Sequence, residues 1–271
     1  MAKRTVGKPR GILRTPPIEG RFAHEQHAPS EDLAPFVEHF WFVSWAVPTP
    51  VVREVLPHPS VHVTIEGDRS AVTGVPLGRF VTTLEGSGFV FGTKFRPGGF
   101  RPFVSASISE LTNRTVPLED VFGDAHRAYE AAVRDARSVG AMISAASSFF
   151  RARAPVADPR VAEVGAIVDR ILADTAIVSV EDVARLVGSS ARALQRLFKE
   201  YVGVSPKWVI RRYRLHEALE RVNAGREVDW AALAIELGWF DQPHFIRDFK
   251  ALVGRTPSEY ARGFRARSRS I

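Results

Sequence analysis

Two stretches of this 271-residue chain carry almost the same sequence. "LQRLFKEYVGVSP" occupies residues 194–206 and "FIRDFKALVGRTP" occupies residues 245–257, an offset of 51 residues. Arg, Phe, Lys, Val, Gly and Pro recur at identical places in the two copies. Such self-similarity predicts one supersecondary unit that is used twice. The repeat therefore constrains the C-terminal part of the fold more than any other feature.

The first copy closes a pattern of two short helices. Ser179 followed by Asp182 resembles a capping box, and Gly188 is a natural stop for the helix between them. One of the next two residues, both Ser, caps a second helix that reaches about Tyr201. The apolar stripe of that helix comprises Leu194, Leu197, Phe198 and Tyr201, and its polar side comprises Arg192, Gln195, Arg196 and Lys199. This pattern is typical of a helix-turn-helix.

The second copy follows the same rules. Asp229 is placed to cap "WAALAIEL", and Gly238 to stop it. Asp241 is placed to cap the next helix, where Pro243 falls in the first turn and its missing N–H costs little. Four polar side chains of this helix are predicted to face outward: Gln242, His244, Arg247 and Lys250. The chain therefore predicts a second helix-turn-helix.

A single helix is expected between the two units. It starts with Ser205 as its cap and Pro206 at its first position, and it runs to about Asn223 before Gly225. About 18 residues of helix span roughly 27 Å. That length suits a strut between two recognition helices one turn of DNA apart, about 34 Å. The repeat thus predicts that one chain reads two consecutive major-groove segments.

These segments resemble a known family. "LQRLFKEYVGVSP", "RLHEAL" and "LAIELGWFDQPHFIRDFKALVGRTPSEY" closely resemble the AraC-type (AraC/XylS) DNA-binding domain over about residues 165–264. The resemblance implies a bilobed domain of seven helices with two helix-turn-helix units, which controls transcription. Pro243 and His244 stand where family members often carry small polar residues.

Base chemistry selects candidate DNA contacts on the two second helices. Arg can bridge guanine O6 and N7, and Gln can bridge adenine N6 and N7. Lys199 and Lys250 are better suited to phosphates. The candidate base readers are Arg192, Gln195 and Arg196 in the first unit and Gln242, His244 and Arg247 in the second. The alternative for each of these residues is a solvated surface charge or a pair within its own helix.

The N-terminal half has a different character, which gives an α+β fold class. Residues 35–103 contain short β-branched or aromatic runs separated by Gly, Pro and Asp, and helical patterns follow from Ser107. We expect a β-rich domain, with a small barrel as one arrangement of its strands. The predicted division is a disordered basic arm (1–30), a sensor or oligomerisation domain (31–150), a linker (151–160) and the double helix-turn-helix domain (161–271).

Two N-terminal motifs are ligand-site candidates. "HFWFVSW" (39–45) offers Trp41, although a core strand buried on both faces explains this motif better. "FGTKFRPGGFRPF" (91–103) places Lys94, Arg96 and Arg101 near a Gly-Gly turn, where they could hold an anion or simply form a structural corner. With "ELTNRTVPLEDVFG", these motifs resemble a domain often found ahead of AraC-type domains. The resemblance implies sensing or oligomerisation and names no ligand.

Several function classes are disfavoured by the sequence. The absence of Cys removes disulfides, Cys-based zinc sites and thiol nucleophiles, including the thiol of the DNA alkyl-repair enzymes that some AraC-type domains accompany. "HEQH" (24–27) spaces its His residues three apart, whereas zinc proteases space them four apart. His39, His58 and His62 lack a matching carboxylate. We therefore expect no enzyme activity, metal or cofactor.

Charge distribution supports a polyanionic partner. Residues 1–21 hold six Lys/Arg against one Glu, residues 22–159 hold 12 against 15 acidic residues, and residues 160–271 hold 19 against 14. Clustered positive charge favours nucleic acid by counterion release, although a basic surface need not have a partner. No apolar run reaches membrane-spanning length, and the N-terminal residues lack a signal-peptide core.

The predicted protein is therefore a bacterial, cytoplasmic, nucleoid-associated regulator of transcription. Its expected partner is double-stranded DNA, while a small-molecule effector, RNA polymerase and a second copy of the chain remain open. The alternative is a DNA-binding protein without an effector, whose N-terminal domain is purely structural. In either case the basic arm of residues 1–21 could add phosphate contacts or have no role.

Overall fold

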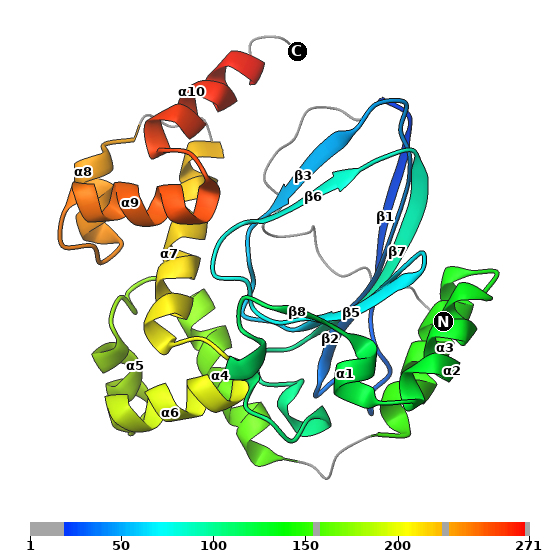
Figure 1. Cartoon of the computed structure of the whole chain (residues 1–271). Helices are drawn as coiled ribbons and strands as arrows, with labels where there is room; N and C mark the ends of the chain where they lie inside the picture. The colour runs from blue at the N-terminus through cyan, green and yellow to red at the C-terminus, as the bar shows by residue number, and fades with distance from the viewer. Residues whose placement is uncertain (1–18, 154–157, 224–227, 269–271) are drawn as a thin grey trace.

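The computed structural model describes residues 19–153, 158–223 and 228–268, with side chains as far as Arg262. Eight strands and three helices precede residue 154, and the described chain beyond it is helix and turn. Figure 1 shows the strands gathered on one side and the C-terminal helices on the other. The α+β class predicted from the sequence is confirmed.

Six strands form one antiparallel sheet in the order β1-β2-β7-β4-β5-β8. Their bounds are β1 Arg21–His27, β2 Val37–Ala46, β7 Ser87–Phe95, β4 His62–Glu66, β5 Arg69–Thr73 and β8 Thr115–Pro117. The other two strands, β3 (Val51–Val55) and β6 (Phe80–Leu84), pair only with each other and form a separate ribbon. The sheets do not close, so the small barrel considered above is wrong. A three-residue last strand that ends in Pro117 offers little backbone for closure.

Strand β1 corrects the predicted arm. Residues 21–27 were expected within a disordered segment, yet they pair with β2 from Arg21 opposite Ala46 to His27 opposite Phe40. Their side chains alternate between exposed and half-buried, as an edge strand requires. Residues 1–18 of the predicted arm lie outside the described residues.

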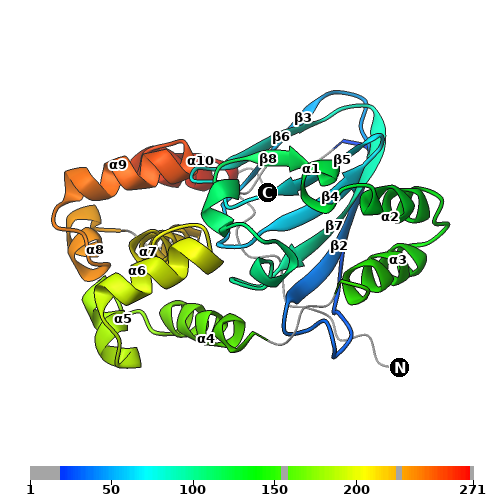
Figure 2. The same ribbon diagram turned by 60° about the horizontal axis from the view of Figure 1, so that its bottom comes forward.

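Helices α2 (Ala125–Arg134) and α3 (Val139–Arg151) cover one face of the six-stranded sheet. Figure 2 shows them on the opposite side of the sheet from helices α4–α9. Aromatic rings fill the layer: Phe95 lies edge-on to Phe150 with centroids 5.2 Å apart, and Tyr129 stacks on Phe149 at 4.4 Å. A short helix, α1 (Leu118–Phe122), and two 3₁₀ turns, η1 (Arg101–Phe103) and η2 (Ile108–Leu111), complete the N-terminal region.

Seven helices make up the described part of the C-terminal region, as the AraC-type resemblance implied. They are α4 Pro159–Ala173, α5 Val180–Val187, α6 Ala191–Tyr201, α7 Pro206–Asn223, α8 Trp230–Glu236, α9 Gln242–Val253 and α10 Pro257–Ser268. The predicted caps form: Ser179 and Asp182 make a complete capping box, and Ser190 caps α6. Gly188 takes the left-handed conformation at φ +63° that ends α5.

Buried apolar residues form two separate clusters. The larger one runs without interruption from the sheet through α2 and α3 into α4, α5, α6 and the start of α7. The smaller one comprises the end of α7, α8, α9 and nearby turns, together with Leu56 from the N-terminal region. The N-terminal region therefore shares the larger core with the first helix-turn-helix unit (α5–α6), whereas the second unit (α8–α9) lies on a separate, smaller core to which the N-terminal region contributes Leu56.

Candidate nucleic-acid interface

Helix α6 presents one polar side to solvent. Leu194 and Phe198 are buried against the core, with relative exposures of 1% and 0%. The residues predicted as outward-facing in this helix, Arg192, Gln195, Arg196 and Lys199, are all exposed. The apolar spacing of the sequence thus fixes which side of α6 remains available to a partner.

The C-terminal end of α6 is bound by the N-terminal region. Three side chains reach it: Arg101 donates to the Glu200 carboxylate at 2.7 Å, Ser107 to the Lys199 carbonyl at 3.2 Å, and Thr112 to the Gly203 carbonyl at 2.6 Å. These contacts leave the N-terminal half of the helix uncovered. In helix-turn-helix proteins that half supplies most base contacts.

Helix α9 also buries an apolar side and exposes a polar side, except that one of its predicted outward-facing residues is half-buried. Phe245 and Phe249 are fully buried, His244, Arg247 and Lys250 are exposed, and Gln242 is half-buried. Asp241 caps the helix by accepting the His244 backbone N–H at 2.8 Å, and its carboxylate also lies 2.9 Å from His244 Nδ1. These bonds, the backbone N–H first, lower the pKa of Asp241. The cap therefore orients the imidazole, which remains half-exposed for a further contact through Nε2.

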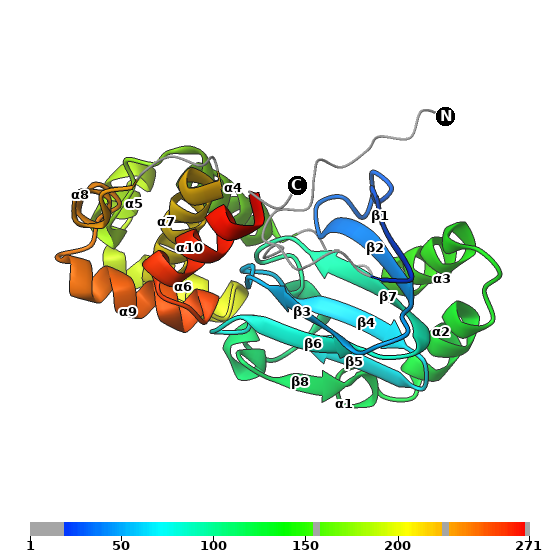
Figure 3. The same ribbon diagram turned by 90° about the horizontal axis from the view of Figure 1, so that it is seen from above.

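Helix α7 joins the two units. It has 18 residues, as predicted, and Figures 1 and 3 show α6 and α9 crossing it on the same side. Arg211 on α7 pairs with Asp248 of α9 at 2.8 Å, and Asp248 also accepts the Trp239 indole N–H at 2.8 Å. These contacts orient the second recognition helix relative to the strut.

Phe240 was missed by sequence reasoning. It lies in the turn before α9 and is 89% exposed, although its neighbour Trp239 is buried. In "GWFDQ" two adjacent aromatic residues cannot both point into the same core from a tight turn, and that was the signal available in the sequence.

The N-terminal candidate residues do not form one site. Lys94 and Trp41 lie on the same face of neighbouring strands, with Lys94 opposite His39 and Trp41 opposite Gly92. Arg96 instead donates to the Ala34 carbonyl at 2.7 Å, and Arg101 is committed to Glu200. The "HFWFVSW" strand is buried at Phe40 but only half-buried from Trp41 onward, so burial on both faces holds for its first part alone.

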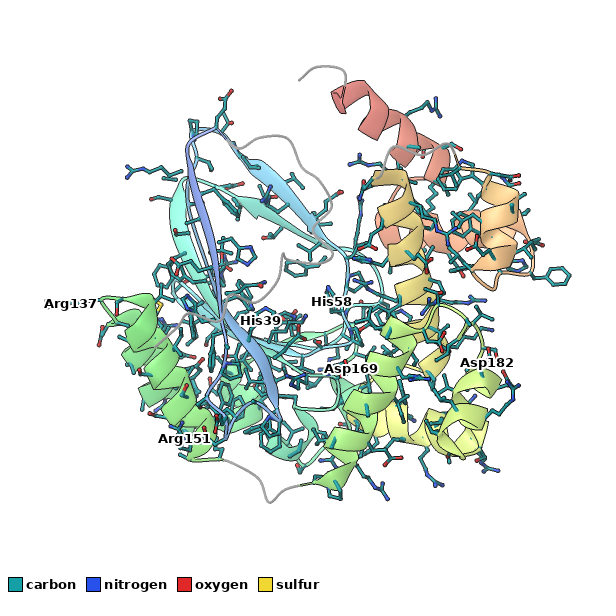
Figure 4. All side chains as sticks on the ribbon, turned by 180° about the vertical axis from the view of Figure 1, so that it is seen from behind. His39, His58, Arg137, Arg151, Asp169 and Asp182 are labelled. Atoms are coloured by element: carbon teal, nitrogen blue, oxygen red, sulfur yellow. The ribbon has the colours of Figure 1, made fainter. Side chains whose placement is uncertain are left out.

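The three histidines considered as metal ligands do not form one site either. His39 and His62 flank Lys94 on adjacent strands, whereas His58 contacts Arg212 of α7 at 3.4 Å. Figure 4 shows His39 on the sheet and His58 nearer the C-terminal helices. No cluster of three metal-ligating side chains occurs in the described ranges. Likewise, none of the described helices is long and apolar enough to cross a membrane.

Two family matches cover the two regions. Residues 25–117 match a family described as a domain of unknown function, DUF6597, and residues 183–263 match a family described as a helix-turn-helix domain. The putative HTH-type transcriptional regulator YkgA of Escherichia coli K12 is 38% identical over 85 residues. That match covers 31% of this chain and 34% of YkgA, so it spans about a third of the relative's length.

The C-terminal part of the chain is an AraC-type helix-turn-helix domain, and a DUF6597 domain precedes it. Among solved structures, an AraC-type DNA-binding protein from Chromobacterium violaceum is 28% identical, with 38% of this chain and 89% of that chain covered and a TM-score of 0.32. ToxT from Vibrio cholerae is 12% identical, with 90% of this chain and 98% of that chain covered and a TM-score of 0.36. In the C-terminal domain of this chain, α5–α6 and α8–α9 are the two helix-turn-helix units.

Proposed function

We propose that this chain is a cytoplasmic regulator that binds double-stranded DNA with α6 and α9 in consecutive major-groove segments. The observation that carries the proposal is the pair of matched helices α6 and α9, which lie on the same side of α7 and carry exposed long polar side chains. Arg192, Gln195 and Arg196 read bases in the first segment, and Gln242, His244 and Arg247 in the second. Lys199 and Lys250 contact phosphates.

The N-terminal domain supplies the input in this proposal. A small molecule bound there changes the population of the DNA-competent arrangement, because the domain contacts both units. It touches the first unit through Arg101 and Glu200, and the second through Glu54 and Arg255 at 3.5 Å.

Selection of binding sites from a random DNA library near physiological salt tests the DNA proposal. We expect a bipartite element whose halves lie about 10 base pairs apart. Arg196→Ala and Arg247→Ala should each relax one half, at about 1–3 kcal/mol per lost bidentate base contact. Arg137→Ala is the matched control, since this exposed arginine lies between α2 and α3, away from the helix-turn-helix units (Figure 4). A library without enrichment, bound in a merely salt-dependent way, would refute sequence-specific reading.

Phe240→Ser refines the same experiment. If the exposed ring contacts a thymine methyl, the variant loses preference for T at one position of the second half, while its folding is unchanged because the ring is 89% exposed. An unchanged selected site would show that Phe240 takes no part in reading.

A further inference from the structure

The six-stranded sheet has a second face, which α2 and α3 do not cover. Across β2, β7 and β4, His39 lies opposite Lys94, and Lys94 lies opposite His62. Trp41 is two residues further along β2 and therefore points to the same side. We call this surface the inner face and define it by His24, His39, Trp41, Trp45, His62 and Lys94. Figure 1 shows the β3–β6 ribbon on this side of the sheet.

Two indole rings cover strand β7 on the inner face. A Cβ placed on Gly92 would lie 2.1 Å from Trp41 Cε2, and one on Gly88 would lie 2.7 Å from Trp45 Cζ2. The indoles thus occupy the space above β7 that side chains would otherwise fill, and only Gly permits this approach. Both tryptophans remain half-buried, not buried, so the aromatic surface is open to solvent in part.

Polar atoms at the edge of this aromatic surface lack partners. Trp41 Nε1 and His39 Nδ1 are shielded from solvent without a hydrogen bond, and His39 as a whole is 6% exposed. His39 Nδ1 lies 3.6 Å from Glu38 Oε1, which is beyond hydrogen-bond range. Buried donors without acceptors are rare in folded proteins and point to a group that completes them.

Titratable side chains surround these atoms. Lys94 is 7% exposed and pairs with Glu38 at 2.9 Å. Arg53 of the ribbon lies over the Phe22 ring of β1 at 4.6 Å, beside His24. Burial, then Lys94 and His39, lower the pKa of His62 to about 3 despite the opposing charge of Glu38. Burial, then His39 and Arg53, also lower the pKa of His24.

We propose that the inner face binds a small planar carboxylate, whose ring lies on the Trp41 and Trp45 indoles and whose carboxylate accepts hydrogen bonds from Trp41 Nε1, His39 and Lys94. A single negative charge fits better than a phosphate dianion, because Glu38 already neutralises part of the lysine charge. The inference rests on the proposed sensing function and names the ligand class of that site. Of the candidates from the sequence, Lys94 and Trp41 contribute to it, and Arg96 and Arg101 do not.

Titration with benzoate and indole-3-carboxylate tests the proposal on the full chain, with calorimetry and tryptophan fluorescence as readouts. Benzamide and inorganic phosphate serve as matched probes that lack the charge or the ring. We expect the carboxylates to bind at least tenfold more tightly than either. Equal binding of carboxylate and amide, or no binding at millimolar concentration, would overturn the proposal.

Point variants distinguish the loss of a binding site from the loss of folding stability. Lys94→Met should weaken carboxylate binding tenfold or more, whereas Glu38→Gln should strengthen it several-fold by removing the competing charge. Opposite effects from the two partners of one ion pair cannot arise from simple destabilisation. Trp41→Phe should weaken binding, and Trp230→Phe, in the second helix-turn-helix unit, should not. Unchanged affinity in Lys94→Met and Trp41→Phe would exclude this face as the site.

DNA selection with the same protein keeps the two proposals distinguishable. A bipartite site selected by a chain that binds no carboxylate contradicts the inner-face proposal and supports the DNA proposal. Carboxylate binding that leaves DNA affinity unchanged supports the inner-face site and contradicts its sensory use.

Discussion

At the scale of single residues, Arg212 is one of two arginines on α7 that are almost fully buried, the other being Arg214. Arg212 is 1% exposed, donates from Nε to the Pro57 carbonyl and lies near His58. Burial lowers its pKa to about 10. Arg212→Ala should therefore lower the free energy of unfolding by about 2–4 kcal/mol, measured by urea denaturation, because it opens a cavity and leaves a buried carbonyl without its donor.

The neighbouring residue provides the control. Arg211 is half-buried, with 40% of its side chain exposed, and pairs with the partly exposed Asp248, so Arg211→Ala should cost less than about 1 kcal/mol. Equal losses in the two variants would contradict the role assigned to Arg212. The sequence gives no sign of this difference, since "IRRYRL" fits an exposed basic stripe, and only tertiary packing buries Arg212 and Arg214 while Arg211 stays partly exposed.

His62 gives the protein a pH dependence. Because its folded-state pKa is lowered from 6.5 to about 3, the unfolded chain binds the proton more readily. Stability contributed by neutral His62 is then complete above about pH 6.5 and decreases as the pH falls toward 3, by at most about 1.4 kcal/mol per pH unit. Urea denaturation between pH 7.5 and 4.5 should show a shallower loss in His62→Gln than in the wild-type protein. Parallel curves would show that His62 titrates normally.

At the scale of secondary-structure elements, the sequence predicts helix caps and apolar helix faces well, because each is encoded within a few neighbouring residues. The sequence left Ser189 and Ser190 as alternative caps of α6, and Ser190 accepts the Ala193 N–H at 3.2 Å. Ser190→Ala should cost about 1 kcal/mol in thermal or urea unfolding. Ser189→Ala, one residue earlier, should be almost neutral. The reverse order would place the cap at Ser189.

Elements whose pairing is non-local could be predicted less well. The runs that became β3, β4, β6 and β7 are visible in the sequence, but nothing local says that β3 and β6 leave the main sheet. Strand β1 was missed because its "RFAHEQH" alternation is short and polar, and it becomes a strand only through pairing with β2. The same limit applies to the inner face, because alternation places Lys94 and Trp41 on strand faces while strand order alone makes them neighbours.

At the scale of the whole molecule, the two cores predict unequal stability. The first helix-turn-helix unit shares its core with the sheet, while the second is held by a smaller cluster. Native-state hydrogen exchange should therefore show α8 and α9 opening at lower free energy than α5 and α6. Simultaneous exchange of all four helices would mean that the molecule unfolds as one cooperative unit.

Glu54 should control how strongly the second helix-turn-helix unit is coupled to the β-rich region. Its carboxylate lies on the ribbon, 85% shielded at the side chain, and binds Arg79 at 2.5 Å and Arg255 after α9 at 3.5 Å. Arg79 in turn packs against Gly254, where a Cβ would lie 2.3 Å from its guanidinium. Glu54→Gln removes the charge that holds both arginines, so exchange in α9 should accelerate several-fold while exchange in α6 stays unchanged. Glu66→Gln, which breaks only the exposed pair with Arg69, is the control. Acceleration in both helices would show that the ribbon stabilises the whole fold; acceleration in α9 alone would identify it as the link through which the β-rich region constrains the second unit.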